Sequence, residues 1–96
     1  MSIYILATKL DAPNLARRRE EGEKWLQLVR EKVPNIRWIA HYAILGPYDF
    51  IDIFEADNES DAAKVSLLSR STGASVAESW TAIPYANFLE FIEELK

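Results

Sequence analysis

Cysteine is absent from the 96 residues, and histidine occurs once, at His41. The first absence excludes disulfides, thiolate metal sites, iron–sulfur clusters and cysteine nucleophiles. The second excludes every metal site that needs two or more histidines, so only carboxylate-rich sites remain. The alternating carboxylates of Asp57, Glu59 and Asp61 come nearest to such a site, but they lack the central glycine and closing glutamate of a calcium loop. We therefore predict helix capping in the run Asp57-Asn58-Glu59-Ser60-Asp61, no metal and no cofactor.

Positive charge is scarce, because 11 Lys and Arg stand against 15 Asp and Glu and give a net charge of −4. Such a chain has no field that would hold nucleic acid or an anionic membrane surface. The one basic cluster, Arg17-Arg18-Arg19, is followed directly by Glu20-Glu21 and Glu23. We predict a solvated helix face with ion pairs four residues apart.

Long hydrophobic runs are also missing, and the first residues lack a basic start and a small-residue cleavage site. Hydrophobic residues nevertheless make up 49% of the chain and aromatic residues 11%, a composition typical of a folded globular protein. We predict one domain over residues 1–96, with the cytoplasm as its default location.

Turn and capping residues divide the chain into alternating strands and helices. The predicted strands are 3–9, 36–45, 48–55 and 74–83, and the predicted helices are about 12–32, 59–71 and 86–95. Asp11 or Asn14 is expected to cap the first helix, and Gly73 to end the second. Gly22 inside the first helix predicts a close approach by another backbone. The order βαββαβ with a C-terminal helix predicts a ferredoxin-like α+β fold with an antiparallel four-stranded sheet.

The hairpin around Gly46-Pro47 carries the one candidate site. A two-residue type II′ turn, with positive φ at Gly46, pairs His41 with Asp52. A histidine beside a carboxylate can transfer protons near neutral pH, although a purely structural hydrogen-bonded pair is the alternative. The residues expected to line a ligand cavity around the pair are Ile39, Phe50, Phe54, Tyr4 and Trp80.

Both faces of the predicted sheet are apolar, yet the helices of this fold cover only one of them. A second copy of the chain, related by a two-fold axis, would cover the other face. We assign Trp38, Ile51 and Ile53 to the helix-covered face, and His41 and Asp52 to the dimer face.

The string Gly46-Pro47-Tyr48-Asp49, the strand over 50–56, the segment 79–84 and the closing helix over 88–95 together resemble the GYD-domain family. The resemblance covers nearly the whole chain. It implies a fold of the dimeric α+β barrel type and a homodimer or higher oligomer, but it carries over no catalytic residue. Its motif residues are Gly46, Tyr48 and Asp49, and Asp49 is expected to accept backbone hydrogen bonds, as turn aspartates do.

Two functions remain open from the sequence. The first is a homodimeric module that binds a small apolar or aromatic ligand in a cavity beside the sheet. The second is a cofactor-free barrel-type enzyme, resembling a monooxygenase or isomerase, in which His41 and Asp52 move protons. Heme held by His41 is a third hypothesis, which a visible spectrum without a Soret band would exclude.

Overall fold

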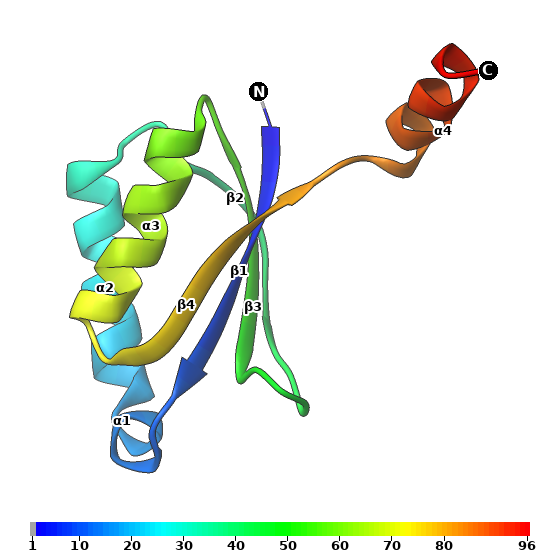
Figure 1. Cartoon of the computed structure of the whole chain (residues 1–96). Coiled ribbons are helices and arrows are strands. Elements are labelled where there is room, and N and C mark those ends of the chain that lie inside the picture. The colour runs from blue at the N-terminus through cyan, green and yellow to red at the C-terminus, as the bar shows by residue number, and fades with distance from the viewer. Residues whose placement is uncertain (1) are drawn as a thin grey trace.

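The computed structural model describes residues 2–96, apart from the side chain of Asn14. The elements, in chain order, are β1 (Ser2–Leu10), α1 (Ala12–Ala16), α2 (Arg18–Lys32), β2 (Arg37–Ala43), β3 (Phe50–Ala56), α3 (Glu59–Ser71), β4 (Ala74–Ala82) and α4 (Tyr85–Glu94). The strands form one antiparallel sheet in the order β2-β3-β1-β4. Helices α2 and α3 cover one face, and α4 stands clear of the body on the other side (Figure 1). The predicted ferredoxin-like α+β fold with a C-terminal helix is confirmed.

The ends of α3 follow the local chemistry predicted from the sequence. Asn58 Oδ1 accepts a hydrogen bond from the backbone N–H of Asp61 at 2.8 Å, which satisfies a free donor of the first turn. After the helix, Gly73 takes a φ of 109°, a conformation that costs glycine no steric strain. The predicted helix over 59–71 is therefore confirmed at both ends.

The helix predicted over 12–32 is instead two helices. Arg17 separates α1 from α2, because its ψ of 12° departs from the helical value. The backbone carbonyl of Asp11 accepts the first hydrogen bond of α1, from Leu15 N–H, whereas the side chain of Asn14 lies outside the described part of the chain. Among the described residues, no helix is both long and apolar enough to cross a membrane.

The predicted backbone approach at Gly22 is wrong. A Cβ built on this glycine would have the Arg18 side chain as its nearest neighbour, with Nε at 3.5 Å. Arg18 lies one helical turn earlier on α2. Because Gly22 has no side chain, the Arg18 side chain can lie along the helix over this position.

The core lies between the sheet and the pair α2 and α3. Trp25 of α2 packs edge-on against Trp38 of β2, with ring centroids 5.2 Å apart, and Trp38 packs in the same way against Phe54 at 5.5 Å. Trp25 Nε1 also donates a hydrogen bond to the Val65 carbonyl at 3.3 Å, which joins α2 to α3. The other buried residues of this core are Tyr4, Leu6, Val29, Val33, Ala56, Ala62 and Ala77.

A β-bulge at Ile39 alters the alternation of side chains along β2. Trp38 pairs with Phe54, but Ala40 already pairs with Ile53, so β2 carries one residue more than β3 at this point. A regular strand would send Trp38 and a residue three positions later to opposite faces. The bulge sends them to the same face.

The predicted assignment of the two faces is right for Trp38 and wrong for the other four residues, because the bulge shifts the alternation along β2. Trp38 and His41 both lie on the helix-covered face, with ring centroids 5.0 Å apart. Asp52 is buried there too, with 4% of its surface exposed, whereas the alternating Ile51 and Ile53 turn to the opposite side. We call that opposite side, which neither α2 nor α3 covers, the far face. The His41–Asp52 pair therefore lies on the helix-covered face and not on the far face, the side predicted for it from the sequence.

The loop after Ala43 keeps the predicted register without the predicted turn. Of the described glycines, only Gly73 has positive φ, so Gly46 does not adopt the type II′ conformation. The ladder ends at Ala43, and Ile44 N–H still donates to the Asp49 carbonyl at 2.9 Å. Hydrogen bonds between Asp49 and β1, and not a tight turn, hold this loop in position.

Candidate functional site

The predicted histidine–carboxylate pair forms across β2 and β3. His41 Nδ1 lies 2.7 Å from Asp52 Oδ1, and the two residues are direct partners in the ladder. The Asp52 side chain is 5% exposed and the His41 side chain 46%, so the carboxylate lies inside the fold and the ring at its surface. A carboxylate that accepts from Nδ1 orients the imidazole and directs its chemistry to Nε2.

Arg18 completes the site, and sequence reasoning missed it. Its guanidinium carbon lies 4.5 Å from the centroid of the Phe50 ring and 5.7 Å from that of Trp25. The sequence places Arg18 in a basic cluster that was predicted to be a solvated helix face. The signal that could have found it is Gly22 four residues later, since a glycine there leaves an arginine room along the helix.

Arg18, His41 and Asp52 are partly shielded from water, and burial and the neighbouring charges shift the pKa values of Asp52 and Arg18. Burial raises the pKa of the Asp52 carboxyl above its ordinary value, while the hydrogen bond with His41 and the charges of His41 and Arg18 oppose part of that rise. Burial lowers the pKa of Arg18, against the attraction of Asp52. Asp52 Oδ2 and Thr8 Oγ1 are both buried, and neither has a hydrogen-bond partner within the described residues.

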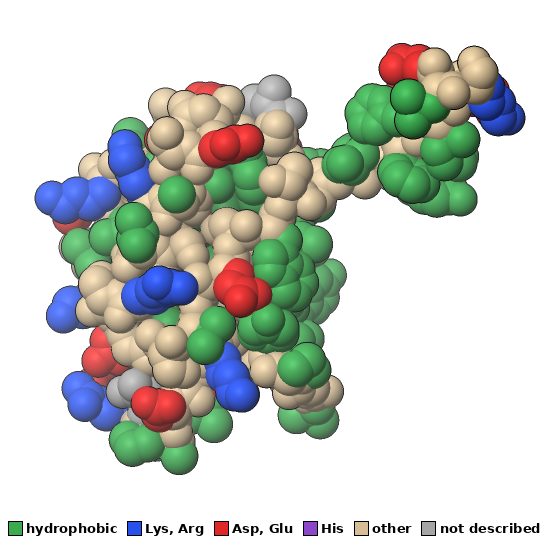
Figure 2. All heavy atoms as spheres, viewed as in Figure 1, with side chains coloured by type: hydrophobic (Ala, Val, Ile, Leu, Met, Phe, Trp, Pro, Cys, Tyr) green, Lys and Arg blue, Asp and Glu red, His purple; other side chains and the backbone are tan. Residues whose placement is uncertain are grey.

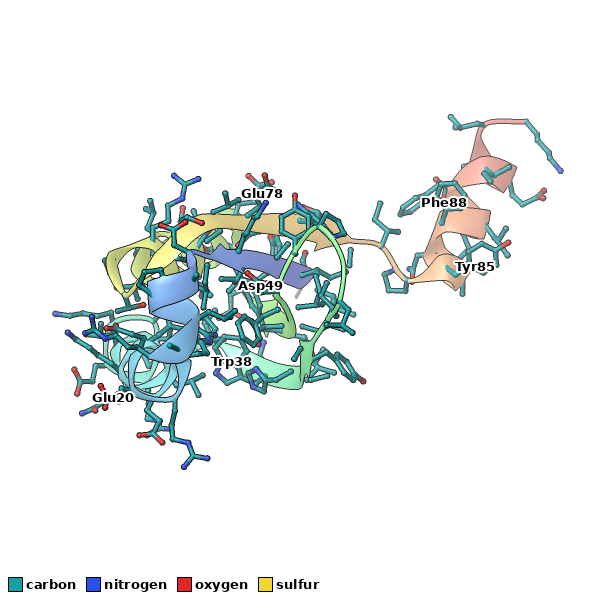
Figure 3. The ribbon with its side chains drawn as sticks, turned by 90° about the horizontal axis from the view of Figure 1, so that it is seen from below. Glu20, Trp38, Asp49, Glu78, Tyr85 and Phe88 are labelled. Atoms are coloured by element: carbon teal, nitrogen blue, oxygen red, sulfur yellow. The ribbon has the colours of Figure 1, made fainter. Side chains whose placement is uncertain are left out.

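An open hollow of about 300 Å³ lies between α2 and the edge of the sheet formed by β2 and β3, and Arg18, His41 and Asp52 are part of its lining. A volume near this value is at the small end of the range for ligand sites. Figure 3 shows Trp38 between α2 and the sheet, next to this region. The residues that line the hollow are Arg18, Gly22, Trp25, Leu26, His41, Tyr42, Ala43, Phe50 and Asp52.

The structure places only part of the predicted lining around the pair. Phe50 lines the hollow, as expected. Tyr4 and Phe54 lie on the same face of the sheet but are sealed in the core, where their rings stack at 5.7 Å. Ile39 and Trp80 are on the far face, 52% and 40% exposed, because Ile39 is the bulge residue and Trp80 alternates with the helix-facing Ser79.

Asp49 ties the hairpin loop to the end of β1. Its backbone N–H donates to the Thr8 carbonyl, and its Oδ2 accepts from the Leu10 N–H, both at 2.8 Å. Asp49 thus accepts a backbone hydrogen bond, as the sequence predicts. Asp49, a motif residue of the family resemblance, therefore has a structural role: its hydrogen bonds hold the hairpin loop against β1.

Tyr48 reaches across the far face to β4. Its hydroxyl donates to Glu78 Oε1 at 2.8 Å, and the same oxygen accepts from Trp80 Nε1 at 3.0 Å. The Tyr48 and Trp80 rings meet edge to face at 5.5 Å. The hydrogen bond to Glu78 raises the pKa of the Tyr48 phenol. Tyr48 therefore joins the hairpin loop to the opposite edge of the sheet, away from the hollow.

Among the described residues, no group of three or more histidine, aspartate or glutamate side chains is arranged to hold a metal ion. The polar groups at the hollow can bind or move protons and can bind a ring or a hydroxyl.

Two solved structures share the fold. The protein TTHA0845 from Thermus thermophilus is 17% identical, with a TM-score of 0.62 over 88% of this chain and 95% of that one. The hypothetical protein PHS023 from Pyrococcus horikoshii is 21% identical, with a TM-score of 0.58 over 88% of this chain and 92% of that one. At these identities the likeness shows the fold alone, the ferredoxin-like α+β arrangement described above.

A curated relative from Thermus thermophilus, the glutamine synthetase and cystathionine beta-lyase binding protein, is 37% identical over 55 residues. The match spans 57% of this chain and 58% of the relative, less than two thirds of that protein's length. The family model described as the GYD domain matches residues 4–92. The chain therefore belongs to the GYD domain family.

Proposed function

We propose that this protein is a homodimeric binding protein that holds a small aromatic or apolar ligand in the hollow beside α2. The observation that carries the proposal is the Arg18 guanidinium stacked on Phe50, in the wall that also contains the His41–Asp52 pair. Aromatic surface and polar donors thus meet at one position. Such a combination favours a flat ligand with one polar group.

Charge balance narrows the class of ligand. Arg18 and an ionised Asp52 offset one another, so the hollow carries little net charge to attract a carboxylate ligand. A neutral hydroxyl or carbonyl can accept a hydrogen bond from Arg18 or meet the half-exposed ring of His41. We therefore expect a phenol-like compound to bind better than the corresponding benzoate.

Calorimetry and thermal-shift measurements with phenol, benzoate and cyclohexanol test this proposal. Phenol should bind most tightly, and Arg18→Met should weaken it about tenfold, equivalent to about 1.4 kcal/mol. Arg19→Met is the matched control, since Arg19 is the exposed neighbour on the same helix. Binding of none of the probes, or equal effects of the two variants, would contradict the proposed site.

The homodimer is supported by the apolar far face. On β2, Tyr42 and Ile39 are 58% and 52% exposed there, and Trp80 on β4, at the opposite edge, is 40% exposed. An apolar sheet surface of this extent is rare on a monomer. A second copy related by a two-fold axis would cover it. The half-buried residues that continue the face are Ile3, Ile5, Ile51 and Ile53.

Native mass spectrometry and light scattering test the homodimer and report any retained small molecule. We expect a dimer that Ile53→Asp converts to a monomer. Leu67→Asp is the control, because Leu67 is an exposed apolar residue on α3, on the other side of the sheet. A monomeric wild type, or an Ile53→Asp variant that stays dimeric, would rule out this interface.

The 2.7 Å contact between His41 and Asp52 favours a cofactor-free enzyme as the second candidate function. His41 would act as the general base at the hollow, and Asp52 would orient its ring. His41→Ala then lowers turnover about 10²–10⁴-fold while ligand is still bound. In a binding protein the same variant changes only affinity or stability.

The name of the Thermus relative supports binding over catalysis and adds other enzymes to the proposed partners. Co-elution of the purified chain with glutamine synthetase and with cystathionine beta-lyase tests that extension. Failure of both to co-elute would leave the small-ligand proposal standing.

A further inference from the structure

The helix in the C-terminal arm, residues 83–95, is not buried against the rest of its own chain. Every residue of α4 is exposed, including Phe88 and Phe91 at 47% and 44%. Figure 1 shows the helix at the end of an extended connection from β4, on the side of the sheet opposite α2 and α3. In Figure 3, Tyr85 and Phe88 are likewise clear of the body. The arm gives the chain a long dimension of 51 Å against a shortest of 17 Å.

An isolated helix of this kind is not stable in water. It has 10 residues, fewer than the roughly 12–15 at which even good helix formers become marginal, and Pro84 provides no side-chain cap. Its sequence is strongly amphipathic, with an apolar stripe on one side and Asn87, Glu90 and Glu93 elsewhere. The members of the stripe are Tyr85, Phe88, Phe91, Ile92 and Leu95. The helix must therefore gain its stability by burying the stripe against another surface.

The connection to α4 holds the arm away from its own sheet. Pro84 takes φ −54° and ψ 136°, an extended conformation that the proline ring favours by fixing φ. In the angle between arm and body lies a hollow of about 370 Å³, whose apolar lining includes Ile3, Ile83 and Phe91. Figure 2 shows hydrophobic side chains along the uncovered side of the sheet and on the side of the arm turned toward it. Arm and far face thus form two apolar walls of one space.

We propose that this space is filled by a second copy, and that each arm packs against the body of the partner copy. The proposal rests on the homodimer proposed above and specifies how it is held together. A second copy brings both an apolar face and an apolar arm, so one two-fold axis covers both walls in both chains. A foreign partner would have to match the two walls with a single surface of its own.

Hydrogen–deuterium exchange of the full chain over a dilution series tests the exchange of arms, with light scattering on the same samples. Amides of residues 85–94 should be protected in the dimer and lose protection on dilution, in step with the dimer fraction. Protection that survives dissociation would show that the arm folds on its own chain and would overturn the proposal. An unprotected arm in an intact dimer would also overturn it, yet leave the homodimer standing. A monomer at every concentration would refute both.

Substitutions on α4 give an independent test, because its exposed residues are not needed for the core. Phe88→Ser and Phe91→Ser should each raise the dimer dissociation constant about tenfold or more. Glu90→Ser, on the polar side of the same helix, should change it by less than about twofold. The urea midpoint of the diluted monomer should be the same in all three variants. Unchanged dissociation constants for both phenylalanine variants would exclude the arm from the interface.

Discussion

The two faces of the sheet have similar apolar content but differ in what covers them. On the helix-covered face, Trp38 packs edge-on against both Trp25 and Phe54, and the Trp25 and Phe54 rings are fully buried. On the far face, Ile53 is half-buried and Trp80 is 40% exposed, with the Tyr48 ring edge-on against Trp80. Apolar alternation thus predicts that both faces are covered. It does not predict which face the helices cover.

The largest effect that separates the two faces is expected at neighbouring residues of β3. Phe54→Ala should lower the free energy of unfolding by about 3–5 kcal/mol, because the ring is fully buried against Tyr4 and Trp38. Ile53→Ala should cost less in dilute solution, where its face is partly exposed. Urea unfolding at low protein concentration measures both losses, and equal values would remove the distinction between the faces.

A smaller loss of stability is expected from a change in the loop between β2 and β3. Asp49→Ala removes the acceptor for Leu10 N–H and should lower the free energy of unfolding by about 1–3 kcal/mol. Asp49→Asn is the control, since its amide oxygen can still accept that hydrogen bond. Thermal or urea unfolding compares the two. If alanine and asparagine have the same effect, the hydrogen bond is not what holds the loop.

On the helix-covered side, Gly22→Ala should raise the free energy of unfolding by about 0.5–1 kcal/mol. Alanine has the higher helix propensity, and the added Cβ would meet only the flexible Arg18 side chain at ordinary contact distance. Ala63→Gly on the exposed side of α3 should show the opposite sign. A destabilised Gly22→Ala variant would show that α2 lies closer to a neighbour than the structure indicates.

The most subtle difference is in pH dependence. Burial raises the folded-state pKa of Asp52, so the folded state binds the proton more tightly than the unfolded state. The stability linked to Asp52 is therefore fully present below its unfolded pKa of about 3.9 and is lost as pH rises through the folded pKa. Asp52→Asn should flatten this decline in urea unfolding measured over acidic to neutral pH, and exposed Asp57→Asn should not. An unchanged slope in Asp52→Asn would mean that the carboxyl ionises equally in both states.

Much of the fold could be predicted because its signals are local. Asn58 and Gly73 mark the ends of α3, and the breaker at Gly46-Pro47 sets the register that pairs His41 with Asp52. The common face of Trp38 and His41 could not be predicted, since no residue near Ile39 distinguishes a bulged strand from a regular one.

The candidate site was predicted only in part for a similar reason. The histidine–carboxylate pair follows from strand register, which the sequence contains. The place of Arg18 depends on how α2 lies over β3, a tertiary relation that a run of three arginines does not reveal. Trp80, expected to line the cavity around the pair, lies on the far face because it alternates with Ser79 along β4.

The bulge at Ile39 has a consequence for comparing this chain with others. In a bulged strand, a tryptophan and a histidine three positions apart face the same side, whereas in a regular strand the same geometry needs a spacing of two. A pattern search with fixed spacing would therefore separate proteins that share this site and group proteins that present the histidine to opposite surfaces. A one-residue gap in an alignment of β2 can therefore mark a bulge that one chain has and another lacks, and such a gap should be kept.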